Sequence, residues 1–208
     1  MCDVAQWKSR VFGGSIPSVA TRIIRMKTLI IHPKDITTDF LCKSYNDDFT
    51  LIRTNISKSL LLKLIRSHDL IIMMGHGTDK GLLGFDKYVI DSSLIDELRK
   101  KICICIWCYA SDFVKKYNLK TPFSTGMFIS EIDEVYLESL NREGDYIELQ
   151  MSNYYFPRLL YHAFKDFDFI KLKERYDKYP NGANFEIFKF NSERFYSNMI
   201  LKNIKNEN

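Results

Sequence analysis

The sequence predicts an α/β fold, a three-layer sandwich in which helices cover both faces of a mostly parallel sheet. Apolar segments of strand length alternate with amphipathic helical segments four or five times along the first two thirds of the chain. Residues 69–74 (DLIIMM) and 102–107 (ICICIW) are apolar almost throughout, which is typical of parallel strands buried on both faces. The remaining sequence has helical periodicity, so a helical C-terminal third is expected to follow the alternating part.

The first strand is expected at residues 27–32 (KTLIIH), an apolar run that is closed by Pro33. Between the third and fourth strands, the words GLLG and KYVI predict a β-hairpin that turns at residues 85–87. In chain order, the sequence predicts strands at residues 27–32, 49–54, 69–74, 102–107 and around 127–130.

Capping residues mark the starts of the expected helices. Residues 37–39 (TTD) can cap a short helix that runs to about residue 45, and Ser57 can cap a helix at 57–68 with its leucines on one face. Further helices are predicted at residues 92–101 and 111–119 and in three stretches after residue 133. Pro157 lies inside the second of those stretches and is expected to kink or divide it.

Residues 1–25 differ from the rest of the chain and are interpreted as a leader outside the folded domain. They have no hydrophobic periodicity and no continuous apolar stretch of the kind that a signal peptide contains. The segments VAQWKSR and GGSIPSVAT resemble peptides translated from a tRNA gene, whereas Met26 directly precedes the first predicted strand. The sequence therefore favours Met26 as the start and predicts a single domain over residues 26–208.

Charge and composition argue against two classes of partner. Residues 1–25 contain four basic residues and one acidic residue, so the rest of the chain carries only +1 of the net charge of +4, and no nucleic-acid partner is predicted. No apolar run approaches the ~18 residues that cross a bilayer, so no membrane association is predicted. The five cysteines are odd in number and three lie in one apolar segment, which favours reduced thiols in a cytoplasmic protein.

Two chemically competent side chains are expected at one edge of the sheet. His76 follows the third predicted strand between two glycines, and Cys108 follows the fourth. Neighbouring parallel strands end at the same edge about 4.8 Å apart, so the imidazole and the thiol come within reach if these strands are neighbours. An imidazolium and a helix N-terminus both lower a thiol pKa, and the N–H groups of Gly77 and Cys108 could form an oxyanion hole. This pattern predicts nucleophilic catalysis by Cys108.

These motifs resemble those of the caspase-like cysteine peptidases. An apolar strand ending in His-Gly (LIIMMGHG), about thirty residues, and a second apolar strand ending in Cys and small residues (ICICIWCYAS) are the pattern of this superfamily. The superfamily, clan CD, includes caspases, metacaspases, gingipains, clostripain, separase and the CHAT proteases. The resemblance covers roughly residues 27–131, and the words IWC and GMFISE are similar to those of short bacterial members. It implies a caspase-like or flavodoxin-like sandwich with Cys108 as the nucleophile and His76 as the general acid and base.

The resemblance implies an endopeptidase that acts on a peptide or protein substrate, with no cofactor and no metal. His32, Asp112, Glu131 and Asp133 are candidates for the substrate pocket, the last two favouring a basic side chain if they face it. The chain departs from the family at Trp107, where many members have Gln, Asp or a Ser–Ala pair, and in its helical C-terminal third. A second hypothesis therefore stays open, namely a catalytically inactive α/β binding or regulatory module that retains the peptidase scaffold.

The cysteine spacing also matches two other kinds of site. Cys103, Cys105 and Cys108 spell C-x-C-x-x-C, but Cys108 has the opposite parity along the strand and no second Cys/His pair completes a zinc site. Cys105 and Cys108 also match the C-x-x-C redox motif, but about 10 Å of extended chain would separate them, too far for a disulfide. Neither site is predicted.

Overall fold

The computed structural model confirms the α/β fold and describes residues 26–46, 49–84, 86–138, 140, 145–179 and 185–197. The predicted leader, residues 1–25, lies outside the described residues. A six-stranded sheet with the order β2-β1-β3-β7-β8-β9 forms the centre of the molecule. Its strands are β1 (Thr28–Ile31), β2 (Thr50–Ile52), β3 (Leu70–Met74), β7 (Ile102–Ile106), β8 (Phe123–Thr125) and β9 (Phe195–Ser197).

All neighbouring strands of this sheet are parallel except β8 and β9, which pair antiparallel. Numbered in chain order, the five parallel strands lie across the sheet in the order 2-1-3-4-5, which is the doubly wound order of flavodoxin-like sheets. β9 extends that sheet at one edge. In sheets of this order, ligands bind beyond the carboxyl ends of the strands.

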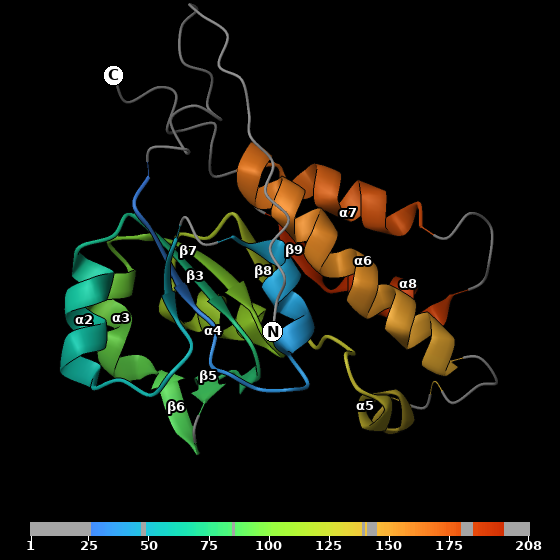
Figure 1. Cartoon of the computed structure of the whole chain (residues 1–208), viewed down its shortest axis with the longest axis horizontal. Helices are drawn as coiled ribbons and strands as arrows, with labels where there is room; N and C mark the ends of the chain where they lie inside the picture. Colours follow the sequence, from blue (N-terminus) through green and yellow to red (C-terminus); the bar gives the residue numbers. More distant parts are fainter. Residues whose placement is uncertain are drawn as a thin grey trace, which may run out of the picture.

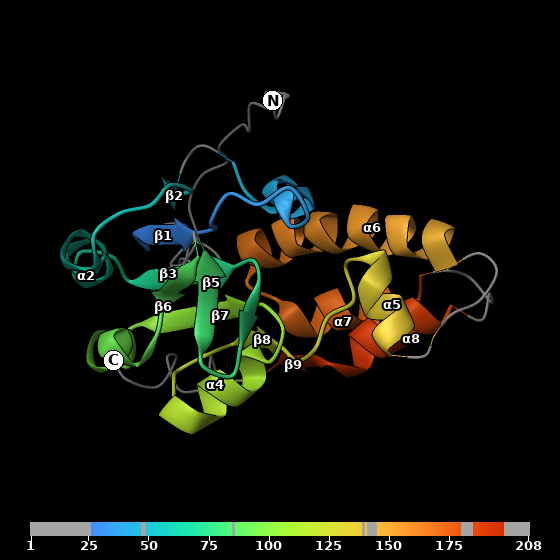
Figure 2. The ribbon, with the colours of Figure 1, turned by 90° about the horizontal axis from the view of Figure 1, so that it is seen from below.

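Helices cover both faces of the sheet, so the molecule has three layers (Figures 1 and 2). The helices are η1 (Asp39–Ser44), α2 (Lys58–Arg66), α3 (Ile95–Leu98), α4 (Ala110–Tyr117), α5 (Ile132–Leu137), α6 (Asp145–Asp166), α7 (Phe169–Asp177) and α8 (Glu186–Glu193). In Figure 1, α2 and α3 lie on one side of the strands, and α6, α7 and α8 lie together on the other.

Alternate residues of the central strands enter two separate cores. In β3, Ile71 and Met73 pack with residues of α2, α3 and α4, whereas Ile72 and Met74 pack with η1, α6, α7 and α8. This alternation follows from the two-residue period of a strand, and it explains why the strand is apolar at every position.

A small antiparallel sheet lies beyond the end of β3. It consists of β4 (Gly77–Thr78), β5 (Gly81–Gly84) and β6 (Lys87–Ile90), and β5 and β6 form the predicted hairpin. Asp86 at the turn has a φ of +67°, and Phe85 lies outside the described residues. Asp91 then caps η2 (Ser92–Leu94), which leads directly into α3.

The predicted fifth strand is wrong in position. Residues 127–130 are not a strand, although Phe128 and Ile129 are buried, and the fifth parallel strand is β8 a few residues earlier. The side chain of Asn191 takes the place of a strand partner there. It accepts from Ile129 N–H at 2.7 Å and donates to Ile129 C=O at 3.0 Å.

The helical third also differs from the prediction. α6 does not divide at Pro157 but runs through it as one helix of 22 residues. Its buried face, which includes Phe156 and Leu160, is held by the core, and such packing outweighs local helix propensity. Near the proline, the Tyr154 carbonyl accepts a hydrogen bond from Arg158 Nη1 at 2.6 Å.

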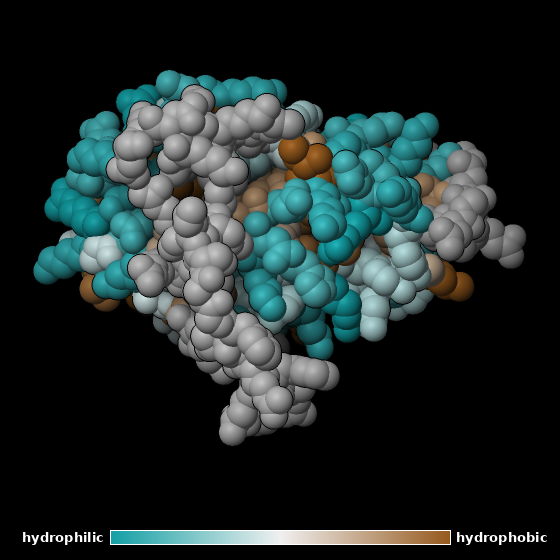
Figure 3. Space-filling model, turned by 90° about the horizontal axis from the view of Figure 1, so that it is seen from above, coloured by the Kyte–Doolittle hydropathy of each residue, from teal (hydrophilic) through white to brown (hydrophobic). Residues whose placement is uncertain are grey.

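None of the helices in the described part of the chain has both the length and the apolar character needed to cross a bilayer. Figure 3 shows one face of the molecule, on which hydrophilic residues cover most of the coloured surface.

Candidate active site

His76 and Cys108 lie at the same level beyond two adjacent strands. β3 and β7 are paired so that Met74 faces Ile106, which confirms that the strands carrying the two motifs are neighbours. Gly75 N–H donates to Ile106 C=O at 3.0 Å and extends the pairing by one residue. His76 and Cys108 each follow their paired residue by two positions, so the topology brings them to one edge of the sheet.

Both side chains line one narrow cavity. Its volume is about 20 Å³, room for about one water molecule. Its walls combine the ends of β3 and β7 with η1, β8, the loop after β8 and α6. The lining residues are Thr38, Phe40, Leu41, Gly75, His76, Ile106, Trp107, Cys108, Thr125, Phe128, Ser130 and Phe156.

A tight turn presents Cys108 to this cavity. Ala110 N–H donates to Trp107 C=O at 3.1 Å across the turn, and Tyr109 has a φ of +64° as the N-cap of α4. A left-handed conformation at a tyrosine costs of order 1 kcal/mol and is kept only where the surroundings impose it. Cys103 and Cys105 lie on the other face of β7, in the core beneath α2, α3 and α4. The opposite parity predicted for Cys108 is therefore confirmed.

The environment of the Cys108 thiol favours its protonated form. Sγ lies 3.5 Å from Phe128 C=O and 3.9 Å from Glu134 Oε1, both of which can accept the thiol proton. Burial raises the pKa of Cys108 to about 12, and the nearby Glu134 and Glu131 carboxylates also raise it. The sequence predicted a lowered pKa, and that prediction is wrong in direction. No hydrogen bond joins the thiol to His76, and the ionisable side chain in contact with the sulfur is the acidic Glu134.

The ring of His76 is oriented through Nε2. This atom lies 2.6 Å from Thr37 Oγ1, 3.3 Å from Glu131 Oε1 and 3.9 Å from Asp35 Oδ1. Thr37 Oγ1 donates its single proton to Asp35 Oδ1 at 2.7 Å, so it must accept from His76. This network assigns the proton to Nε2 and leaves Nδ1 with a free lone pair when the ring is neutral.

Glu131 is the only one of the four predicted pocket residues that the described structure brings to the dyad, where it contacts His76. Asp112 is exposed in the first turn of α4, near Lys115, and Asp133 is exposed in the first turn of α5. Neither lines the cavity. Their prediction as pocket residues is not supported, because helix starts point their first acidic side chains to solvent and to the helix dipole.

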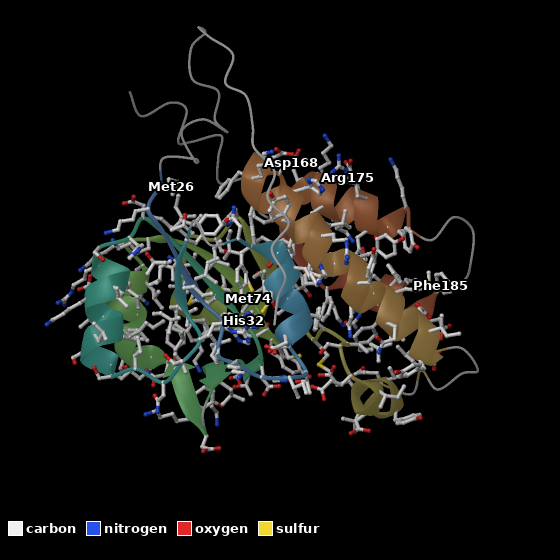
Figure 4. All side chains as sticks on the ribbon, viewed as in Figure 1. Met26, His32, Met74, Asp168, Arg175 and Phe185 are labelled. Carbon is white, nitrogen blue, oxygen red and sulfur yellow. The ribbon has the colours of Figure 1, made fainter. Side chains whose placement is uncertain are left out.

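His32 lies inside the protein rather than on the cavity wall. It follows β1 and is fully buried, in the region where Figure 4 labels it beside Met74. Its Nδ1 lies 2.7 Å from the Tyr45 hydroxyl, and its Nε2 lies 3.4 Å from Thr38 Oγ1. Burial, followed by the positive charge of Arg53, lowers the pKa of His32 to about 4. The predicted role in the substrate pocket is therefore replaced by a structural one.

Gly77 has a steric role that the sequence did not reveal. A Cβ at this position would lie 2.1 Å from Trp107 Cδ1, so only glycine lets the indole pack against β4. The indole Nε1–H donates to Thr78 C=O at 3.0 Å. The predicted use of Gly77 N–H in an oxyanion hole gains no support, since Gly77 does not line the cavity.

Sequence reasoning missed three residues of the site. Asp35 and Thr37 follow β1, the neighbour of β3. The strand order therefore predicts that both residues lie at the carboxyl edge of the sheet, near His76. Glu134 pairs with Glu131 in a capping box at the start of α5. That spacing, a capping residue followed three positions later by Glu, is a recognisable signal of a helix start but not of a thiol neighbour.

Comparisons of the chain with models of protein families, with curated proteins and with solved structures found no match. Within the described ranges, no group of three or more His, Cys, Asp or Glu side chains is arranged to hold a metal ion.

Proposed function

We propose that the chain is a cysteine endopeptidase of the caspase-like type, in which Cys108 and His76 act as a dyad on a peptide or protein substrate. The observation that carries the proposal is their equal offset beyond Met74 and Ile106 on adjacent parallel strands, with both side chains on one cavity. The resemblance of the two motifs to the caspase-like pattern agrees with this placement. Cys103, Cys105 and Cys108 form no disulfide in the described part of the chain, in keeping with the reducing cytoplasm proposed as the location.

The hydrogen bonds of His76 suggest how a proton would move. Thr37 and Glu131 hold the Nε2 proton, so Nδ1 is the atom that would accept the Cys108 proton. The Glu131 and Asp35 carboxylates would then stabilise the imidazolium.

The reaction would proceed in two steps. The Cys108 thiolate attacks the peptide carbonyl, and the imidazolium gives its proton to the leaving amine, which departs as the C–N bond breaks. Water then attacks the thioester with His76 as the base, releasing the acid and restoring the thiol. Because the cavity holds only about one water, it must widen for a peptide to enter.

The second candidate is the inactive binding or regulatory module. The raised pKa of the Cys108 thiol and the small volume of the cavity favour it. In that case the scaffold is retained and Cys108 is a partly buried polar group that donates to Phe128 C=O.

Labelling with peptidyl electrophiles that differ in the residue before the reactive group tests the two candidates. We expect a single adduct on Cys108 that is lost in Cys108→Ala and strongly slowed in His76→Ala. Peptide mapping is needed because Cys42 is also partly exposed. Asp112→Asn is a matched control, since this exposed side chain lies outside the cavity. A folded protein in which no probe modifies Cys108 would favour the binding module.

A further inference from the structure

One short segment contacts both members of the proposed dyad. Residues 128–134, here called the latch segment, run from the end of the cavity wall into the first turn of α5. Phe128 C=O and Glu134 Oε1 face the Cys108 sulfur at 3.5 and 3.9 Å, and Glu131 Oε1 lies 3.3 Å from His76 Nε2.

The two oxygens of Glu134 have different partners. Oε2 accepts from the backbone N–H groups of Ser130 and Glu131 at 2.7 and 3.0 Å, and from Ser130 Oγ at 3.3 Å. Burial raises the pKa of Glu134, and these donors oppose that effect and fix the position of the carboxyl group. Oε1 is thereby left facing the Cys108 thiol.

A fixed carboxylate beside a thiol opposes formation of the thiolate, because two negative charges at this separation repel. It also offers an acceptor that keeps the S–H proton in place. In the same conformation, the Glu131 carboxylate contacts Nε2 of His76. The latch segment therefore holds the nucleophile in its unreactive form while the imidazole is already oriented.

α5 is attached to the molecule more lightly than the helices of the two main cores. Its buried residue is Val135, in a small cluster with Ile129, Leu149 and Ile187, against which the partly buried Ile132 of the same helix also packs. Tyr136 and Leu137 on the same helix are 55% and 80% exposed. Displacing α5 would uncover far less apolar surface than opening the sheet.

We propose that the latch segment is an autoinhibitory element, and that movement of α5 away from the sheet activates Cys108 by removing Glu134 from the thiol. Thr37 and Asp35, which lie outside the segment, then keep His76 oriented without Glu131. This inference rests on the proposed function, since it concerns the same dyad. It differs from a role of Glu134 as the proton acceptor in catalysis, which would make the carboxylate necessary rather than inhibitory.

The test measures the rate at which iodoacetamide alkylates Cys108 in the full chain, by peptide mass spectrometry between pH 7 and 9. Glu134→Gln keeps an oxygen that can accept from Ser130 and Glu131 but removes the charge. We expect the rate to rise about tenfold or more, because the thiolate fraction rises as the thiol pKa falls. Asp133→Asn, an exposed change on the same helix, should leave the rate within about twofold of wild type.

A second variant tests the movement without altering any charge. Val135→Ala removes the buried contact of α5, so the latch should open more often and alkylation should again accelerate. Thermal melting establishes that each variant is folded. Unchanged alkylation in both variants would overturn the proposal. A slower rate in Glu134→Gln would also overturn it and would identify Glu134 as the proton acceptor.

Different experimental outcomes contradict the autoinhibition proposal and the peptidase proposal. Faster alkylation by iodoacetamide without any reaction with peptidyl electrophiles would support the latch and contradict the peptidase. Reaction with peptidyl electrophiles at one rate in wild type, Glu134→Gln and Val135→Ala would support the peptidase and contradict the latch.

Discussion

Substituting Gly77 tests the packing of Trp107, the residue that follows β7, against β4. In Gly77→Ala, the new Cβ would lie 2.1 and 2.5 Å from Trp107 Cδ1 and Cγ and 2.7 Å from Gly81 C=O. The indole cannot move aside freely, because it is 2% exposed, donates to Thr78 C=O and packs edge-on against Phe113.

The expected cost has two parts. Overpacking of a filled core costs about 1–3 kcal/mol, and loss of the indole hydrogen bond adds about 1 kcal/mol. The free energy of unfolding should therefore fall by about 2–4 kcal/mol. For a chain of this size, 1 kcal/mol corresponds to about 2–4 °C, so the Tm should fall by roughly 5–15 °C.

The assay is urea and thermal denaturation followed by circular dichroism, with Gly126→Ala as the matched control. A Cβ at Gly126 would be 3.3 Å from Arg194 Cβ and from the Tyr196 ring. Tyr196 is 39% exposed and can shift, so the control should lose less than about 1 kcal/mol. A Gly77→Ala protein that melts within 2 °C of wild type would refute the packing of Trp107 on β4.

The remaining predictions concern the dyad, a buried histidine and a buried amide. His76→Ala should abolish peptidase activity about as fully as Cys108→Ala, with the double mutant little worse, whereas additive losses measured in the same assay would separate the two residues. His32 has a pKa of about 4 in the folded state against 6.5 in the unfolded state, so the unfolded state binds the extra proton between these values. The free energy of unfolding should fall by up to about 3 kcal/mol as the pH falls from 6.5 to 4, and urea denaturation of His32→Gln should lack this component. Asn191→Leu leaves both backbone groups of Ile129 unpaired in the core and should cost about 3 kcal/mol or more by denaturant titration, while the exposed change Glu193→Gln should cost under 0.5 kcal/mol.

The parallel strands and the positions of His76 and Cys108 could be predicted from the sequence because both depend on strong local patterns. β3 and β7 are uninterrupted apolar runs, and a residue that follows such a strand must lie at the carboxyl edge of the sheet. β9 could not be predicted in this way, because three residues are too few to show a period and it pairs with a strand far away in the chain.

The chemistry of the thiol could not be predicted, because it depends on the path of an irregular segment. The apolar residues Phe128 and Ile129 predict a strand, but the Asn191 side chain of α8 binds the backbone of Ile129 and keeps the segment in an irregular conformation. That course brings Glu134 to Cys108, and neither the strand pattern nor the helix-start pattern contains this contact. Burial and the carboxylates of Glu134 and Glu131 then reverse the pKa shift that a helix start and an imidazole suggest.

The aromatic contacts of β9 have a consequence for when the cavity can form during synthesis. Phe195 lies 6.0 Å from the Phe128 ring and 5.1 Å from the Phe156 ring, and both of those rings line the cavity. The ribosome makes β9 after every other element of the sheet. A nascent chain that already contains His76 and Cys108 therefore lacks a support of the cavity wall until Phe195 has emerged, so assembly of this site is tied to the arrival of the C-terminal strand.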